Sequence, residues 1–106
     1  MAKYDAIAKE FDLICDIVAE YYDVSKDWLM VRNVADVVNA RYSAICVMCE
    51  SYLDFEVAKV SRLDVRTVNK IKNNVMSKQR DKQFYRGLED IKKLFKTKMQ
   101  QIDNQH

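Results

Sequence analysis

The sequence is poor in the residues that make tight turns. Its 106 residues include one glycine and no proline. Strand-rich folds depend on tight turns with positive φ angles, which glycine usually supplies. This scarcity predicts an all-α protein: a compact helical domain of about five to six helices joined by short polar connections. Hydrophobic residues make up 49% and charged residues 32% of the chain, a composition typical of a globular domain.

The shortage of glycine and histidine also excludes several kinds of active site. The single glycine, Gly87, cannot form a glycine-rich loop, so a Walker or Rossmann nucleotide site is excluded. The only histidine is His106, so a Ser-His-Asp triad or a His-rich zinc site lacks its key member. Cys46 and Cys49 form one Cys-x-x-Cys pair without two further ligands, which does not make a zinc site. We therefore expect no catalysis, no metal and no cofactor.

Cysteines and long apolar runs are few. The three cysteines, Cys15, Cys46 and Cys49, lie within apolar segments. An odd number of cysteines favours free, buried thiols in a reducing compartment. Residues 1–10 lack the apolar core of a secretory signal, and no apolar run reaches the roughly 18 residues that a membrane span needs. We expect a cytoplasmic protein without a membrane partner.

The two halves of the chain carry opposite charge. Residues 1–61 hold 6 Lys or Arg and 11 Asp or Glu, a net charge of −5. Residues 62–106 hold 12 Lys or Arg and 5 Asp or Glu, a net charge of +7. A basic half on a helical scaffold points to a polyanion, most commonly nucleic acid. An ordinary solvated helix face is the other explanation of such a charge run.

Apolar residues at helical spacing predict the helices. We expect one domain over residues 1–100, with helices at residues 4–22, 35–52, 55–60, 65–76 and 78–100, and a frayed tail at residues 101–106. The helix over residues 35–52 is the most apolar, which predicts that it is central. Asp54, Asp64 and Ser77 are expected to cap the helices that follow them, because their side-chain oxygens can accept unpaired backbone N–H groups.

Residues 56–68 have the pattern of a helix-turn-helix. Val57 and Val60 fix the first helix to the core, and Leu63 fills the turn. Asp64 caps the second helix. That helix is held down by apolar residues three and four positions apart, namely Val68, Ile71 and Val75. A glycine is commonest in such a turn, so a non-glycine residue there with positive φ is strained. A purely structural helical hairpin gives the same pattern.

The opposite face of the second helix predicts a DNA-reading surface. In this motif the start of the second helix enters the major groove. Arg favours guanine and Asn favours adenine, each by two hydrogen bonds. The residues expected to touch base edges are Arg66, Thr67, Asn69 and Lys70. Basic residues nearby contact phosphates without reading sequence, and those expected to do so are Lys59, Arg62 and Lys72.

Further residues carry a resemblance to a known family. The segments concerned are residues 18–24 (VAEYYDV), 27–29 (DWL), Arg32, residues 37–41 (VVNAR) and residues 62–68 (RLDVRTV). Together they resemble the C-terminal DNA-binding domain of the bacterial replication initiator DnaA. The resemblance spans about residues 14–95. It implies a helical double-stranded-DNA-binding domain that acts in the regulation of transcription or DNA replication.

The resemblance also implies roles for single residues. Arg32 matches an arginine that enters the minor groove, and Arg41 matches one that holds the DNA backbone. Asp64 and Thr67 match residues of the recognition helix that face bases. The family's histidine and first Ser/Thr are Val65 and Arg66 here, so a different DNA sequence is expected.

Other departures affect the loop and the turn. The family's second loop cation is Asn33, its proline is Ala40, and its G-x-R turn is missing. The family's ATPase domain is also missing, which implies a stand-alone relative of the kind a phage or other mobile element encodes.

A protein-interaction module is the alternative function. In that case the acidic first helix or the basic last helix docks a partner protein or a second copy of the chain. The carboxylates of the first helix are otherwise a solvated face. Tyr21, Tyr22 and Trp28 can stack on unpaired bases, but in a domain of this size we expect them in the core.

Overall fold

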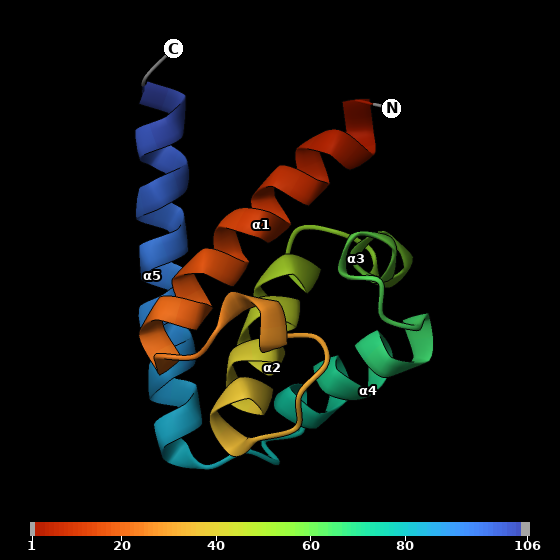
Figure 1. The fold of residues 1–106 in the computed structure, drawn as a ribbon, viewed down its shortest axis with the longest axis vertical. Helices are drawn as coiled ribbons and strands as arrows, with labels where there is room; N and C mark the ends of the chain where they lie inside the picture. Colours follow the sequence, from red (N-terminus) through yellow and green to blue (C-terminus); the bar gives the residue numbers. More distant parts are fainter. Residues whose placement is uncertain (1, 105–106) are drawn as a thin grey trace.

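Most of the residues that the structure describes lie in helices (Figure 1). The structure is a computed structural model that describes residues 2–104. Its elements are α1 (Ala2–Tyr22), the 3-10 helix η1 (Lys26–Trp28), α2 (Ala35–Cys49), α3 (Asp54–Ser61), α4 (Val65–Met76) and α5 (Lys82–Asn104). No strand occurs within residues 2–104. The predicted all-α class with about five helices is therefore confirmed.

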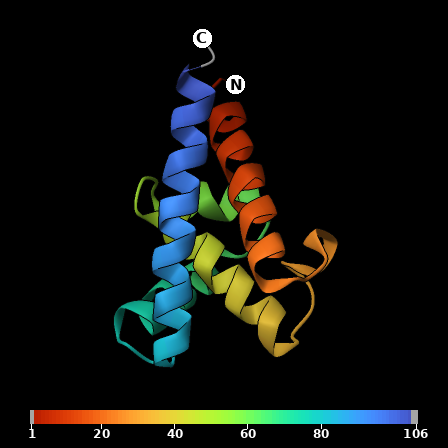
Figure 2. The same cartoon turned by 90° about the vertical axis from the view of Figure 1, so that its left-hand side faces the viewer.

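α2 lies at the centre of the fold, as its apolar composition predicts. In Figure 1, α5 lies to its left, α3 and α4 lie to its right, and α1 crosses in front. Figure 2 shows α1 and α5 side by side. Eight of the fifteen residues of α2 are buried, among them Ala44 and Ile45, which are 0% exposed. The buried Ser43 is satisfied locally because its hydroxyl donates to the carbonyl of Asn39 at 2.9 Å.

Non-glycine residues take the place of glycine at three helix ends. Asp23, Arg62 and Lys78 have φ angles of 55°, 64° and 59°. Glycine is the usual residue in this left-handed region after a helix, and an L-residue there costs about 1–2 kcal/mol. The fold therefore makes its short connections without glycine and carries backbone strain at each of these positions.

Several predicted helix ends are wrong. α2 ends at Cys49 rather than at residue 52, since residues 50–52 form a turn; the hydroxyl of Tyr52 donates to the Glu10 carboxylate of α1. Asp54 is not the cap of α3. The capping position is Leu53, whose N–H donates to the Glu56 carboxylate at 3.0 Å. Asp54 is instead the first residue of that helix.

The last helix differs from its prediction at both ends. Ser77 follows the end of α4, and α5 begins at Lys82. Asp81 caps α5, since its carboxylate accepts the N–H of Phe84 at 2.8 Å. Residues 101–104 continue α5 rather than fraying, and the rest of the predicted tail, Gln105 and His106, lies outside the described residues.

The aromatic residues are less buried than expected. Trp28 is 44% exposed and Tyr21 is 41% exposed, so the expectation that they lie in the core is wrong. Tyr22 is half-buried. Both tyrosines pack on the one glycine: a Cβ at Gly87 would lie 3.1 Å from the Tyr22 hydroxyl and 3.2 Å from the Tyr21 ring. Gly87 thus allows close packing between α1 and α5 and does not serve a turn, and a larger residue there would have to displace the tyrosine side chains by a few tenths of an ångström.

The cysteines are free, and two of the three are buried, as expected. Cys15 and Cys46 are buried and Cys49 is half-buried. Burial raises the pKa of the Cys15 and Cys46 thiols to about 12, because it disfavours the charged thiolate. The thiols therefore pack as small apolar groups.

Candidate nucleic-acid interface

α3 and α4 form two helices joined by residues 62–64. In Figure 1, α3 is seen end-on while α4 runs across the view, so the two helices cross steeply. Val57 of α3 is 0% exposed, and Ala58 is also buried. On α4 the predicted inward residues are all buried: Val68, Ile71 and Val75. Burying each such side chain contributes about 1.5–3 kcal/mol, which holds α4 in one orientation.

The connection between the two helices is fixed at both ends. Arg62 has a left-handed backbone, with φ 64° and ψ 18°, and its side chain is exposed. Asp64 caps α4 as predicted: its carboxylate accepts the N–H of Arg66 at 2.8 Å. Such a cap contributes about 1 kcal/mol. Because the Asp64 carboxylate is bound to the backbone, its first function in this structure is to start the helix.

The outward face of α4 is polar and cationic at its start. Arg66, Thr67 and Lys70 are exposed. Among residues 2–104, no carboxylate forms an ion pair with Arg66 or Lys70. Val65, at the position of the family's histidine, is 42% exposed. Three of the four predicted base-reading residues, Arg66, Thr67 and Lys70, are therefore presented together on one turn and a half of helix.

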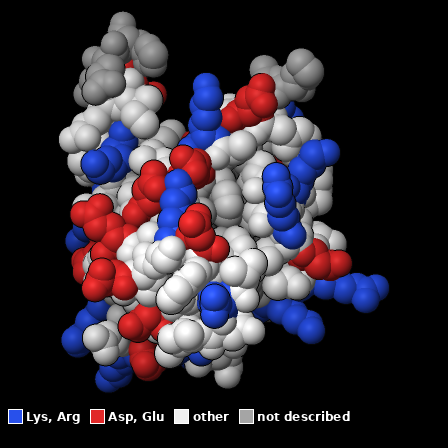
Figure 3. Space-filling view, in the orientation of Figure 1, with Lys and Arg blue, Asp and Glu red and all other residues white. Residues whose placement is uncertain are grey.

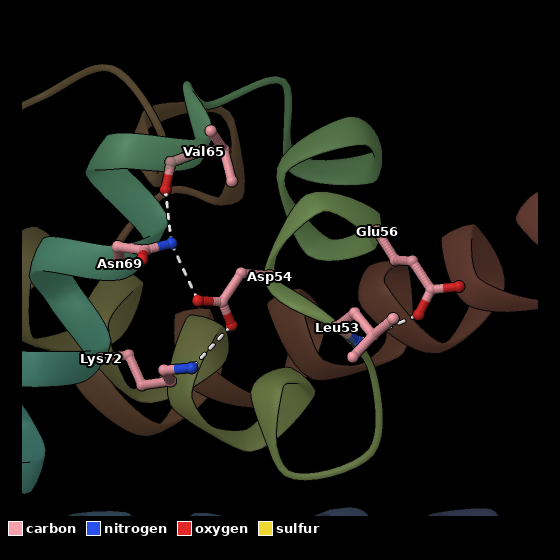
Figure 4. Close-up of polar contacts among 6 residues, drawn as sticks. All are labelled: Leu53, Asp54, Glu56, Val65, Asn69 and Lys72. Carbon is pink, nitrogen blue, oxygen red and sulfur yellow. Dashed lines mark hydrogen bonds and ion pairs between the residues drawn. The ribbon is translucent and has the colours of Figure 1, made fainter.

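The side chain of Asn69 is exposed, but its amide already makes two hydrogen bonds within the protein (Figure 4). Its amide nitrogen donates to the Asp54 carboxylate at 2.8 Å and to the Val65 carbonyl at 2.9 Å. The other carboxylate oxygen of Asp54 accepts from the Lys72 ammonium at 2.8 Å. This bond raises the pKa of Lys72. Of the residues expected to contact DNA, Asn69 and Lys72 are thus bound to α3.

A second cluster lies in the loop before α2. The guanidinium of Arg41 donates to the carbonyl of Leu29 at 2.6 Å, to the side chain of Asn33 at 3.2 Å and to the carbonyl of Arg32. Burial lowers the pKa of Arg41. Its donors are directed into the loop, so in this structure Arg41 holds the loop rather than facing outward as a phosphate contact would.

The same loop presents the residue expected in the minor groove. Arg32 is exposed, and its guanidinium lies over the Trp28 ring at 5.0 Å from the centroid. Such a cation–π contact contributes about 0.5–1 kcal/mol at an exposed site. The exposed Trp28 therefore has a role that the sequence did not predict, which is to orient Arg32.

The two halves of the sequence do not form separate acidic and basic faces in Figure 3. Acidic side chains gather over the C-terminal half of α1 with basic ones among them, and basic side chains project at the right over α3, which belongs to the acidic half of the sequence, and over the start of α4. Lys59 of α3 is exposed, and its ammonium lies over the Tyr4 ring at 4.9 Å from the centroid. Lys26 pairs with Asp12 and Asp16 of α1, at 2.6 and 2.7 Å.

Two contributors to the site were missed from the sequence. Asp54 was interpreted as a cap, and its partners Asn69 and Lys72 lie 15 and 18 residues away. Trp28 was interpreted as a core residue. A contact between carboxylate and amide across a turn leaves no signal in residue spacing. Trp28 is the last residue of η1, four residues before Arg32 in the same connection, and that proximity was the available signal.

The described residues hold no other obvious site. Residues 2–104 contain no group of three or more His, Cys, Asp or Glu side chains that could hold a metal ion. Within the same part of the chain, no helix is both long and apolar enough to cross a membrane. No model of a known protein family, no curated protein and no solved structure matches the chain.

Proposed function

We propose that this protein binds double-stranded DNA through the α3–α4 unit, as a helix-turn-helix, and regulates transcription or DNA replication by occupying a site. The proposal rests on one observation: Arg66, Thr67 and Lys70 are exposed side by side at the start of α4, and no described carboxylate pairs with either cation. The resemblance to the DNA-binding domain of DnaA supports the same assignment.

Affinity and specificity have different sources in this proposal. Lys59 and Arg62 contact phosphates and release counterions, which is independent of sequence. Arg66 reads a base edge, most favourably guanine, and Thr67 contacts a neighbouring base. Lys70 lies one turn further along α4. If about five phosphates are neutralised, the logarithm of the affinity falls with the logarithm of the salt concentration with a slope of roughly −4 to −5.

The loop before α2 adds a second contact in this proposal. Arg32 enters a minor groove, where a narrow groove attracts a guanidinium. Arg41 positions that loop by its bonds to the backbone of Leu29 and Arg32. Its contribution to DNA binding is therefore indirect, through the loop.

Arg66→Ala tests the proposal. A random pool of duplexes is first selected on the wild-type protein to obtain a site. Arg66→Ala is then expected to weaken binding to that site by about 1–3 kcal/mol and to relax the preference at one base pair. Lys9→Ala is the control, because it removes one exposed positive charge from α1, far along the chain from α4. If Arg66→Ala and Arg32→Ala both leave duplex binding unchanged, α4 and the loop do not read DNA.

A specific feature of α5 favours a second candidate, a module that docks a partner protein. Leu94 and Ile102 are each 44% exposed on the basic last helix. Exposed apolar residues with a cationic border are typical of a helix that packs on a partner. In this case Ile102→Glu abolishes association with the partner protein, or with a second copy of the chain, as measured by sedimentation. The wild-type protein then shows no binding to duplex DNA.

A further inference from the structure

We propose that Asp54 is a positioning residue that makes Asn69 accept either adenine or cytosine, the two bases with an amino group in the major groove, rather than adenine alone. The proposal rests on the proposed DNA binding by α4 and deepens it. It follows from the two hydrogen bonds of the Asn69 amide nitrogen, to the carboxylate of Asp54 at 2.8 Å and to the carbonyl of Val65 at 2.9 Å.

The orientation of the Asn69 amide is set by chemistry. A carboxylate oxygen and a backbone carbonyl oxygen can only accept hydrogen bonds. The group between them must therefore be the NH₂ end of the amide, as Figure 4 shows. An amide turned by 180° would place an oxygen against two oxygens. The ammonium of Lys72 binds the other carboxylate oxygen of Asp54 at 2.8 Å, so the bond to Asn69 does not depend on it.

These two bonds use both hydrogens of the Asn69 amide, so only the amide oxygen remains to contact a base. An asparagine reads adenine by accepting from N6–H₂ and donating to N7. With both N–H groups taken, Asn69 can only accept. The bases that offer a donor at this place in the major groove are adenine, through N6–H₂, and cytosine, through N4–H₂. Guanine and thymine offer an acceptor there. Asn69 therefore accepts adenine or cytosine and rejects guanine or thymine.

Removing Asp54 releases one amide hydrogen. In Asp54→Ala the bond to the Val65 carbonyl persists, and the second N–H can donate to N7 of adenine. The preference at the position read by Asn69 then narrows from adenine or cytosine to adenine alone. We expect at least about fivefold discrimination between the two bases, the lower limit for a good bidentate pair.

The experiment selects duplexes from a random pool on four proteins. Asn69→Ala identifies the position, since its preference is lost there. The wild type is expected to accept adenine and cytosine about equally at that position, and Asp54→Ala adenine alone. Lys72→Met is the matched control: it removes the other bond to Asp54 and keeps that of Asn69, so the adenine-or-cytosine preference persists whatever happens to overall affinity.

The outcomes separate this inference from the proposed function. If the wild type enriches no duplex, the proposed function and this inference both fail. If it enriches a site but prefers adenine alone at the Asn69 position, or if Asp54→Ala keeps the mixed preference, only the role of Asp54 is overturned.

A measurement without DNA covers the case in which Asp54→Ala does not fold. The side-chain NH₂ protons of Asn69 are expected to exchange with solvent more slowly than those of the exposed Asn73 in the wild-type protein, followed by NMR. Equal exchange rates for Asn69 and Asn73 would overturn the inference.

Discussion

Arg62 is at once a strained residue and a predicted phosphate contact, so one substitution has two opposite effects. Its φ of 64° lies in the left-handed region, which costs an L-residue about 1–2 kcal/mol. Glycine removes this strain, but it also increases the conformational entropy of the unfolded chain. That entropy cancels about 0.5–1 kcal/mol of the stability gained. Arg62→Gly is therefore expected to raise the free energy of unfolding by about 0.5–1 kcal/mol, or the Tm by about 4 °C.

The same substitution is expected to weaken DNA binding. Loss of one phosphate contact reduces the salt slope of the affinity by about 0.9. Thermal unfolding followed by circular dichroism measures the first effect, and duplex titrations at several salt concentrations measure the second. Arg62→Lys is the control, because it keeps both the charge and the strain, and neither quantity should change. A lower Tm in Arg62→Gly would refute the strain argument, and an unchanged salt slope would refute the phosphate contact.

Three further predictions concern the fold. Glu56 pairs with Lys3 at 2.7 Å, which lowers the Glu56 pKa. Wild type should therefore be more stable than Glu56→Gln at neutral pH, and the Tm difference should begin to shrink as the pH falls below about 4, the ordinary pKa of Glu, and be lost below the lowered pKa; a constant difference would contradict this. Burial raises the pKa of Cys46 to about 12, so its thiol should react with Ellman's reagent at pH 8 only after denaturation. Ile45 is 0% exposed in α2, so Ile45→Ala should lower the free energy of unfolding by about 2–5 kcal/mol, measured by urea unfolding. A decrease below about 1 kcal/mol would contradict its place in the core.

The helix of the candidate site could be predicted from the sequence because its signals are local. Asp64 precedes an apolar spacing of three and four residues, and the structure begins α4 directly after it. The same reasoning failed at Asp54. An aspartate near a helix start can be the cap or the first residue, and Glu56 reaching back to the N–H of Leu53 decides between the two.

Long-range polar contacts could not be predicted. Arg41 contacts the carbonyl of Leu29, 12 residues earlier, and Asp54 contacts Lys72, 18 residues later. Whether a cation faces solvent or a neighbouring element depends on how the helices cross, which residue spacing does not specify. For this reason the sequence grouped Arg41 and Lys72 with Lys59 and Arg62, whereas the structure binds the first two internally and exposes the others.

The most direct test of the central claim is an NMR titration of the protein with its selected duplex, followed through the backbone amides. The account predicts that the largest shift changes fall on residues 62–70, with a second group near Arg32. It predicts little change along residues 93–102 of α5. Changes confined to α5, or none at stoichiometric duplex, would contradict the claim that the start of α4 binds DNA.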